Sequence, residues 1–138
     1  MAVFSNSDEM WQVMGPLWDR IKAHPAMSRE LLKSGLIVQF RYRDPELVLT
    51  IDCSDHQDMK IILGSGPNKP VVAMSMKADV AHQFWLGKVS VPLAILTGKI
   101  TSVGPTQRAL ALLPMIQPAF PIYAQILKDH GKATLIHK

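Results

Sequence analysis

Two polar segments of the sequence hold the residues whose types and spacing could do chemistry. Cys53 and His56 could pair as a nucleophile and its base, and His56, Asp58 and the distant His82 could contribute to a metal site. Metal sites need three or four converging ligands, and none of these pairs has helical spacing. Because Cys53 and His56 lie where a predicted strand becomes a turn, we interpret them as parts of a solvated loop rather than as a catalytic pair.

The second segment is the glycine-rich run Gly-Ser-Gly-Pro-Asn-Lys at 64–69. It lacks the third glycine of a dinucleotide-binding loop, the helix that would follow it, and the Lys-Ser/Thr pair of a phosphate loop. A hairpin turn between two strands is therefore the prediction. The sequence also contains no Gly-x-Ser-x-Gly nucleophile motif. These absences argue against an enzyme, a resident metal and a cofactor.

Basic residues form a third pattern. Arg41 and Arg43 share the outer face of a predicted strand, and Lys60 and Lys77 lie on neighbouring strands. Such a face could attract a lipid headgroup or a phosphate, although a solvated sheet face is the simpler interpretation. Nucleic-acid binding is disfavoured, because it requires aromatic side chains among the cations and Tyr42 points to the opposite face.

Length and composition limit the class of protein. The chain has 138 residues, of which 48% are hydrophobic and 19% charged, with a net charge of +4. These values are typical of one folded domain and exclude general disorder. No run approaches the roughly 18 to 20 apolar residues that cross a bilayer. The N-terminus lacks the features of a secretory signal, the last three residues are not a peroxisomal tripeptide, and a single cysteine suits a reducing compartment. We expect a cytoplasmic protein.

The spacing of apolar residues predicts elements that would position these side chains. A helix is expected at 7–24, where Pro16 either kinks it or begins a second helix, and another at 28–34, ended by Gly35. An alternation with period two then predicts four strands joined as an antiparallel meander. These strands are 36–42, 47–51, 59–63 and 71–77.

The remainder of the chain is mostly helical in pattern. Asp79 is expected to cap one short helix that stops at Gly87, and Ser90 to cap another that stops at Gly98. Residues 100–103 are compatible with a fifth strand. Prolines then divide an apolar stretch into helices at about 106–113 and 120–130.

Large, soft apolar side chains are more numerous than covering helices need. The sequence contains eight methionines and three tryptophans, and its last third is rich in Leu, Ile and Met. They could fill an ordinary core or line a cavity whose shape adapts to a ligand. Composition does not separate these two alternatives.

Residues 71–104 carry a resemblance to a known family. A strand ending Met74-Ser75-Met76 is followed by Asp79, a first Gly-Lys at 87–88, the segment Pro-Leu-Ala-Ile-Leu at 92–96, a second Gly-Lys at 98–99, and Gly104. This order resembles the sterol carrier protein 2 (SCP2) sterol-binding domain. Two Gly-Lys stops around a short helix are specific as a set, and the resemblance extends over about residues 10–115.

The resemblance implies an α+β fold, in which helices cover one face of a five-stranded, mostly antiparallel sheet and enclose an apolar tunnel. It also implies non-enzymatic binding or transfer of a fatty acid, acyl-CoA, sterol or phospholipid, with no cofactor. Ligand-binding residues would be Phe40, Met74, Met76, Phe84, Trp85, Leu93, Leu96, Leu110, Leu113, Ile116 and Phe120. Burial of the ligand's carbons would supply most of the affinity.

We expect a single SCP2-like domain over 1–138, with a helical lid at about 105–130. The long proline-broken ending departs from the family, and the absent peroxisomal signal points to a free-standing, bacterial member. Arg20 and Gln39 are candidates for contact with a ligand headgroup. Transient contact with a membrane surface or a lipid-metabolising enzyme is expected, and nucleic acid is not. The alternative is an accessory module that docks on such an enzyme, and an enzyme of lipid or steroid degradation is a weaker third hypothesis.

Overall fold

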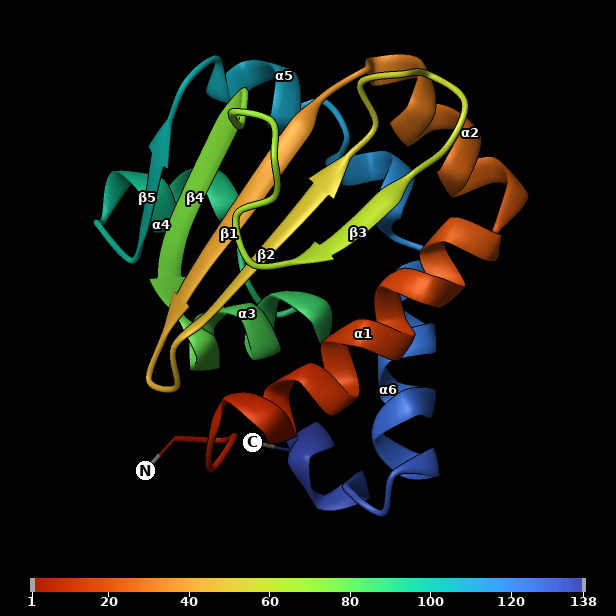
Figure 1. The fold of residues 1–138 in the computed structure, drawn as a ribbon. Coiled ribbons are helices and arrows are strands. Elements are labelled where there is room, and N and C mark those ends of the chain that lie inside the picture. Colours follow the sequence, from red (N-terminus) through yellow and green to blue (C-terminus); the bar gives the residue numbers. More distant parts are fainter. Residues whose placement is uncertain (1, 138) are drawn as a thin grey trace.

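The computed structural model describes residues 2–137, and its central element is one five-stranded sheet (Figure 1). The strands are β1 (Ile37–Arg43), β2 (Leu47–Asp52), β3 (Lys60–Leu63), β4 (Val72–Lys77) and β5 (Ile100–Val103). Their order in the sheet is β3-β2-β1-β4-β5. Three neighbouring pairs are antiparallel, and β1 and β4 are parallel. The prediction of a mostly antiparallel sheet is confirmed.

The predicted meander holds only for the first three strands. β4 pairs with β1 and not with β3, so residues 64–69 do not form a hairpin turn. They belong to a connection that crosses the face of the sheet opposite the helices (Figure 1). Two hydrogen bonds hold it there: the Thr50 hydroxyl donates to the Gly64 carbonyl (2.7 Å) and the Asn68 amide to the Asp52 carboxylate (2.9 Å). Alternation along a strand shows which face is buried, but not which strand is the neighbour.

Helices cover the other face of the sheet (Figure 1). They are α1 (Ser7–Ala23), α2 (Pro25–Ser34), α3 (Ala78–Trp85), α4 (Val91–Leu96), α5 (Thr106–Leu110), the 3-10 helix η1 (Leu113–Ile116), α6 (Ala119–Asp129) and the 3-10 helix η2 (Ala133–His137). The predicted α+β class is therefore confirmed. α6 runs beside α1, where Arg20 and Asp129 form an ion pair at 3.2 Å.

α1 is one continuous helix, and Pro16 lies inside it. Its buried face continues across the proline from Val13 to Leu17 and Ile21, so packing against the sheet keeps the two halves together. The helix begins at Ser7, and Asn6 is the N-cap, because its side chain accepts a hydrogen bond from the Glu9 N–H (2.8 Å).

The other helix ends test further sequence predictions. Ser90 caps α4, as predicted, and Gly35 ends α2 with the left-handed backbone that glycine adopts at low cost (φ 64°). Asp79, however, is not the cap of α3, which begins one residue earlier, at Ala78. Its carboxylate accepts a hydrogen bond from the Val3 N–H (2.8 Å), which attaches the N-terminal segment to α3.

Gly104 shows why a glycine follows β5. Its φ is 105°, and a Cβ added there would collide with the Val71 carbonyl oxygen just before β4. The backbones of the two strand ends therefore approach more closely than any side chain would allow.

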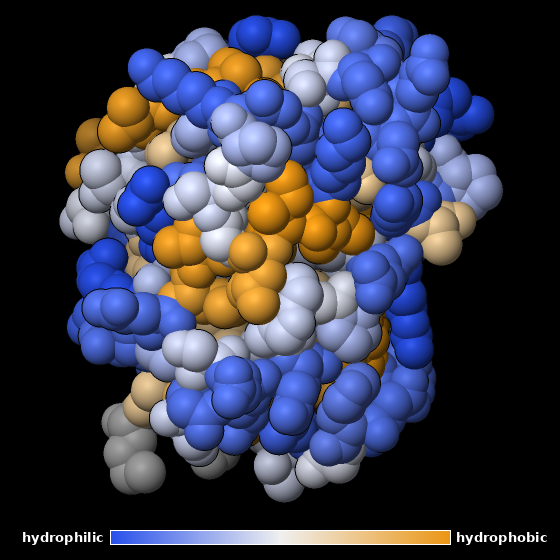
Figure 2. All heavy atoms as spheres, viewed as in Figure 1, coloured by the Kyte–Doolittle hydropathy of each residue, from blue (hydrophilic) through white to orange (hydrophobic). Residues whose placement is uncertain are grey.

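The surface on the side of the β3–β4 connection is mainly polar at its rim, with apolar side chains near its centre and toward β5 (Figure 2). Leu63 on β3 and Val103 on β5 are 55% and 67% exposed. Within residues 2–137 no single helix is long and apolar enough to cross a membrane; one pair, Thr106–Ile116 with Ala119–Asp129, passes by length and composition but is bent by 69°.

Candidate ligand-binding cavity

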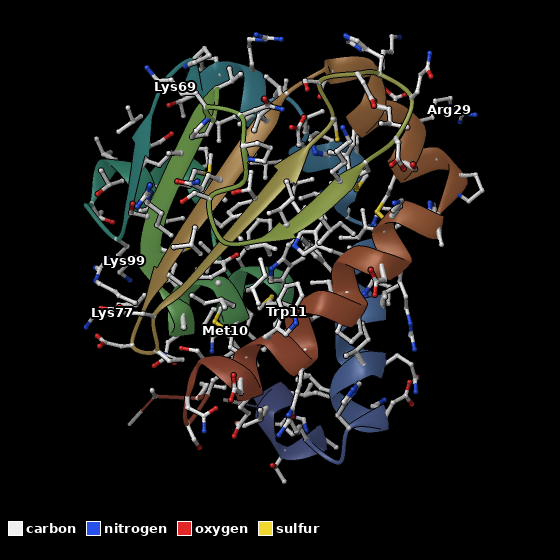
Figure 3. All side chains as sticks on the ribbon, in the orientation of Figure 1. Met10, Trp11, Arg29, Lys69, Lys77 and Lys99 are labelled. Atoms are coloured by element: carbon white, nitrogen blue, oxygen red, sulfur yellow. The ribbon has the colours of Figure 1, made fainter. Side chains whose placement is uncertain are left out.

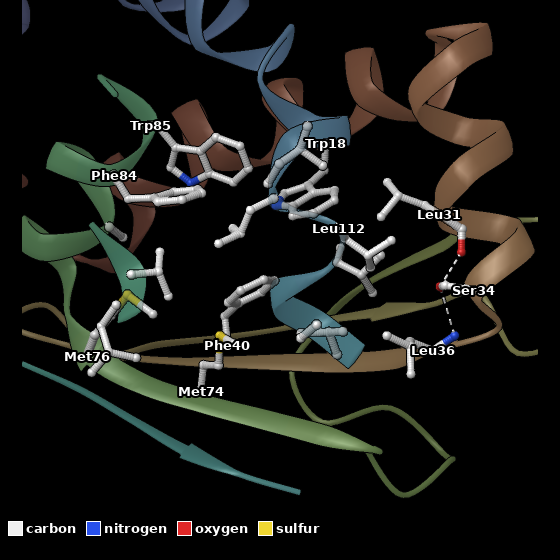
Figure 4. Close-up of a pocket in the computed structure, with 18 of the residues that line it drawn as sticks. Trp18, Leu31, Ser34, Leu36, Phe40, Met74, Met76, Phe84, Trp85 and Leu112 are labelled. Atoms are coloured by element: carbon white, nitrogen blue, oxygen red, sulfur yellow. Dashed lines mark hydrogen bonds between the residues drawn. The ribbon is translucent and has the colours of Figure 1, made fainter. Parts of the chain in front are cut away.

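An apolar cavity of about 90 Å³ lies between the sheet and its helical layer (Figure 4). Twenty residues line it: Trp18, Leu31, Ser34, Leu36, Val38, Phe40, Tyr42, Ile51, Cys53, Met74, Met76, Ala81, Phe84, Trp85, Val91, Ile100, Ala109, Leu112, Leu113 and Ile116. None of the twenty is Asp, Glu, Lys, Arg or His. The cavity is thus an apolar space with room for several waters but few partners for them.

Four aromatic rings surround one end of the cavity (Figure 4). Trp18 of α1 stands perpendicular to Trp85 of α3, with ring centroids 5.8 Å apart, and Phe40 of β1 lies 5.9 Å from Trp18. Phe84 packs edge to face on Trp85 at 4.9 Å. Rings at these separations attract one another, so they form a firm wall at this end.

The other end of the cavity lies between α2 and the chain around Leu112. Ser34 is the polar residue there, and its hydroxyl is already engaged: it donates to the Leu31 carbonyl (2.6 Å) and accepts from the Leu36 N–H (3.2 Å) (Figure 4). Arg108 of α5 donates to the Ser34 carbonyl from outside (3.2 Å). A cation therefore lies beside this end without entering the cavity.

Two titratable groups line the cavity, and burial keeps both of them neutral. Burial raises the pKa of Tyr42, and burial together with the nearby carboxylates of Asp52, Asp55 and Asp58 raises the pKa of Cys53 to about 12. A thiol with such a pKa carries almost no thiolate at neutral pH and is a poor nucleophile.

Seven of the residues predicted to bind ligand come together around the cavity. They are Phe40, Met74, Met76, Phe84, Trp85, Leu113 and Ile116. They come from β1, β4, α3 and η1. Whether they contact a ligand stays a prediction.

Leu93, Leu96, Leu110 and Phe120 lie outside the cavity. Leu93 and Leu96 are 57% and 82% exposed, because α4 turns its buried side, Val91 and Ala94, toward the molecule. Leu110 and Phe120 pack on the core, and the Phe120 ring lies edge to face against Phe84 at 5.6 Å. On this side the wall is thus built by η1, by Ala109 of α5 and by Val91 at the start of α4, and α6 contributes no lining residue.

Neither headgroup candidate reaches the cavity. Arg20 lies on the surface of α1 in its ion pair with Asp129. Gln39 is buried, but it lies on the opposite face of β1 from Phe40 and Tyr42, where its amide contacts the Thr50 hydroxyl (3.3 Å).

Sequence analysis missed thirteen of the lining residues, and Trp18 is the one with most consequence. Trp18 had a readable signal, since it belongs to the apolar face of α1 and is one of only three tryptophans. The pattern of one helix, however, does not indicate which other element its apolar face packs against. Small lining residues such as Ala81 and Ala109 carry no signal, because only the space beside them distinguishes them from core alanines.

The residues first considered for chemistry are not brought together. Cys53 is buried in the cavity wall, whereas His56 is exposed and its ring bonds to the Leu32 carbonyl (2.9 Å). Among residues 2–137 no group of three or more His, Cys, Asp or Glu side chains could hold a metal ion.

A second hollow, of about 300 Å³, lies between α3 and α4. Its walls include the exposed residues Lys88, Leu93, Thr97 and Lys99, so it is open to solvent. It lacks the enclosure that a lipid chain requires and is a less suitable ligand site than the first cavity.

Comparison with known proteins identifies the fold. No family model matches the sequence, and no curated protein matches it. Solved structures do match, among them sterol carrier protein domain 2 of Helicoverpa armigera, with 21% identity, a TM-score of 0.62, and coverage of 80% of this chain and 89% of that one.

Two further matches agree with the first. Sterol carrier protein 2 of Yarrowia lipolytica in its apo form has 19% identity and a TM-score of 0.60, over 87% of this chain and 92% of that one. The palmitated SCP2-like protein SCP2L2 of Aedes aegypti has 17% identity and a TM-score of 0.51, over 77% of this chain and 92% of that one. The chain therefore has the SCP2 fold, as the sequence resemblance predicted.

Proposed function

We propose that this chain, which has the SCP2 fold, binds one lipid in the cavity between its sheet and its helices and carries it without chemical change. The observation that supports this most directly is the cavity wall itself, which contains apolar side chains from both the sheet and the helices and no ionisable residue that is charged at neutral pH. Such a wall binds by desolvating carbon, at roughly 0.8 kcal/mol per buried CH₂ before the costs of association.

The same wall supports a non-enzymatic role. Acyl or phosphoryl transfer requires an activated nucleophile or a charge that stabilises the transition state. The Cys53 thiol and the Tyr42 hydroxyl are both held in their neutral forms, and no histidine or carboxylate lies in the wall to activate them. A wall of neutral, apolar groups therefore supports binding of a ligand rather than its chemical conversion.

The experiment fills the cavity and measures the loss of binding. Val38→Phe adds a ring to a lining position on β1, and Val103→Phe makes the same exchange at a position on β5 that is 67% exposed and outside the cavity. We expect Val38→Phe to weaken binding of a fluorescent fatty acid at least about tenfold, because the ring occupies the space that the chain needs, and Val103→Phe to leave it within about twofold. Native mass spectrometry of the protein from its own cells would then show a bound mass of a few hundred daltons, and solvent extraction would identify it.

Thermal melts of both variants separate binding from folding. If the wild type carries no ligand from cells and refuses the fluorescent fatty acid, the lipid-binding proposal is wrong and the accessory docking role becomes the better account. Equal binding by both variants would place the ligand elsewhere on the molecule.

A membrane is the source of ligand that the surface supports. α4 exposes Leu93 and Leu96, and the side chains of Lys77 and Lys99 project from the same edge of the molecule (Figure 3). Apolar side chains among cations suit the interface of an anionic membrane. The alternative occupant of this surface is a lipid-metabolising enzyme, and a measurement of vesicle binding distinguishes the two.

A further inference from the structure

The buried indole N–H of Trp18 lacks a partner. The Trp18 side chain is 3% exposed, and within residues 2–137 its Nε1 has no hydrogen-bond acceptor. Buried donors are almost always bonded, because burial removes the water that would otherwise accept from them. An orphaned donor in a cavity wall therefore indicates something that the cavity is built to hold.

The donor faces the cavity rather than the solvent or the core. Trp18 is one of the lining residues, and Figure 4 shows the nitrogen edge of its ring turned toward Trp85 and the interior of the cavity. The rings of Trp85 and Phe40, at 5.8 and 5.9 Å between centroids, are its nearest aromatic neighbours. Their faces accept an N–H only weakly, so they do not replace an oxygen acceptor.

Within residues 2–137 no acceptor of the protein itself bonds to Trp18 Nε1. The Ser34 hydroxyl is occupied by Leu31 and Leu36. The other buried side-chain atom left unpaired within residues 2–137 is an acceptor, Gln39 Oε1, but it lies across the sheet from Trp18. The two orphans cannot satisfy each other through a strand.

Building on the lipid-binding function proposed above, we infer that the ligand is an uncharged lipid with a ketone or ester carbonyl, whose oxygen accepts a hydrogen bond from Trp18 Nε1. A carbonyl brings an acceptor and no donor, which complements a wall whose unpaired group is a donor. A hydroxyl would bring a donor that needs an acceptor in turn. An ionised carboxylate buried in a wall without Lys, Arg or His would be unpaired, which is costly, so a fatty acid would bind with its carboxylate left in solvent and would not bond to Trp18 Nε1.

The test compares two ligands that differ by one oxygen. Methyl pentadecyl ketone and heptadecane have the same carbon count, and each is measured by its displacement of a bound fluorescent fatty acid. We expect wild-type protein to bind the ketone about tenfold more tightly, the factor that one net hydrogen bond supplies. Trp18→Phe should abolish this preference, so that the ketone and heptadecane bind the variant with equal affinity. Trp11→Phe, the same exchange type in the same helix but outside the cavity, should retain the preference.

A second readout does not depend on a variant that folds. In a nitrogen-labelled wild-type sample, the indole N–H resonance of Trp18 should move downfield with the ketone and not with heptadecane. If both ligands bind the wild type equally and the resonance does not distinguish them, the carbonyl inference is overturned while the lipid-binding function stands. If neither ligand nor the fluorescent fatty acid binds, the function itself fails, and the inference fails with it.

Discussion

His82 is a fully buried residue whose protonation state matters for stability. Both ring nitrogens are hydrogen-bonded: Nδ1 lies 2.6 Å from the Tyr123 hydroxyl, and Nε2 lies 2.8 Å from the Leu135 carbonyl oxygen. A carbonyl only accepts, so Nε2 carries the proton, and Nδ1 accepts from Tyr123 in the neutral ring. The ring thus joins α3, α6 and η2 through one neutral tautomer.

We predict that the free energy of unfolding decreases as the pH falls below about 6.5. Burial lowers the pKa of His82 below its ordinary 6.5, and the charge of Lys88 adds to this effect, while the Leu135 carbonyl and the Asp79 carboxylate oppose it. The unfolded chain therefore binds a proton that the folded chain resists, so this contribution to stability is complete above pH 6.5 and declines toward the lower folded pKa. Urea titrations from about pH 8 to about pH 5, the range that brackets histidine titration, would measure it.

The control for this prediction is His82→Gln, which does not titrate. It should be less stable than the wild type at pH 8 by about 1–3 kcal/mol, since a buried hydrogen bond is weakened, but its stability should decline less with acid. A slope equal to that of the wild type would assign the pH dependence to other groups.

At the scale of elements, α4 is a helix that exposes large apolar side chains to solvent. Leu96 is 82% exposed, and we predict that Leu96→Asp weakens binding to vesicles that contain anionic lipid about tenfold, because a leucine that enters the interface is replaced by a repelled charge. Leu63→Asp is the matched control: Leu63 is also exposed, on β3 at the opposite edge of the sheet, and this exchange should leave vesicle binding unchanged. Both variants should fold with stability within about 0.5 kcal/mol of the wild type.

Vesicle flotation or sedimentation would measure the effect, and added salt should reduce wild-type binding, since Lys88 and Lys99 line the same hollow as Leu93. Equal loss in both variants would mean that α4 is not the membrane-facing element. If the wild-type protein does not bind vesicles at all, the result would favour an enzyme as the partner of α4.

The elements could be predicted well because each carries a local physical signal. The period of two in 36–42 and the Gly35 stop are properties of short segments, and both agree with the structure. Long-range relations carry no such signal: the alternation in β4 is the same whether it pairs with β3 or β1. The site followed the same rule. Met74 and Met76 were predictable from the strand face, whereas Leu96 was wrongly placed, because six residues of α4 do not indicate which side is buried.

At the scale of the whole molecule, the cavity is too small for the ligand proposed. Its volume of about 90 Å³ is below the roughly 150 Å³ of an engineered cavity that binds benzene. A lipid would therefore have to separate the walls. Strands β1 and β4 are held by backbone ladders on both sides, so they resist this movement. The wall formed by α5 and η1 consists of helices of five and four residues, and neither has a side-chain hydrogen bond at its N-cap.

We therefore predict that 106–116 is the segment that moves when ligand enters. Hydrogen–deuterium exchange by mass spectrometry should show fast exchange there in the free protein, and at least about threefold slower exchange when palmitate fills the cavity, because the bound chain packs against Leu112, Leu113 and Ile116. Amides of α6 should change less, because that helix packs on α1 and supplies no lining residue. Val38→Phe with the same palmitate should show no protection. Protection confined to α2 would mean that the cavity opens on the Leu31 and Ser34 side instead. In that case residues 106–116 would not be the lid.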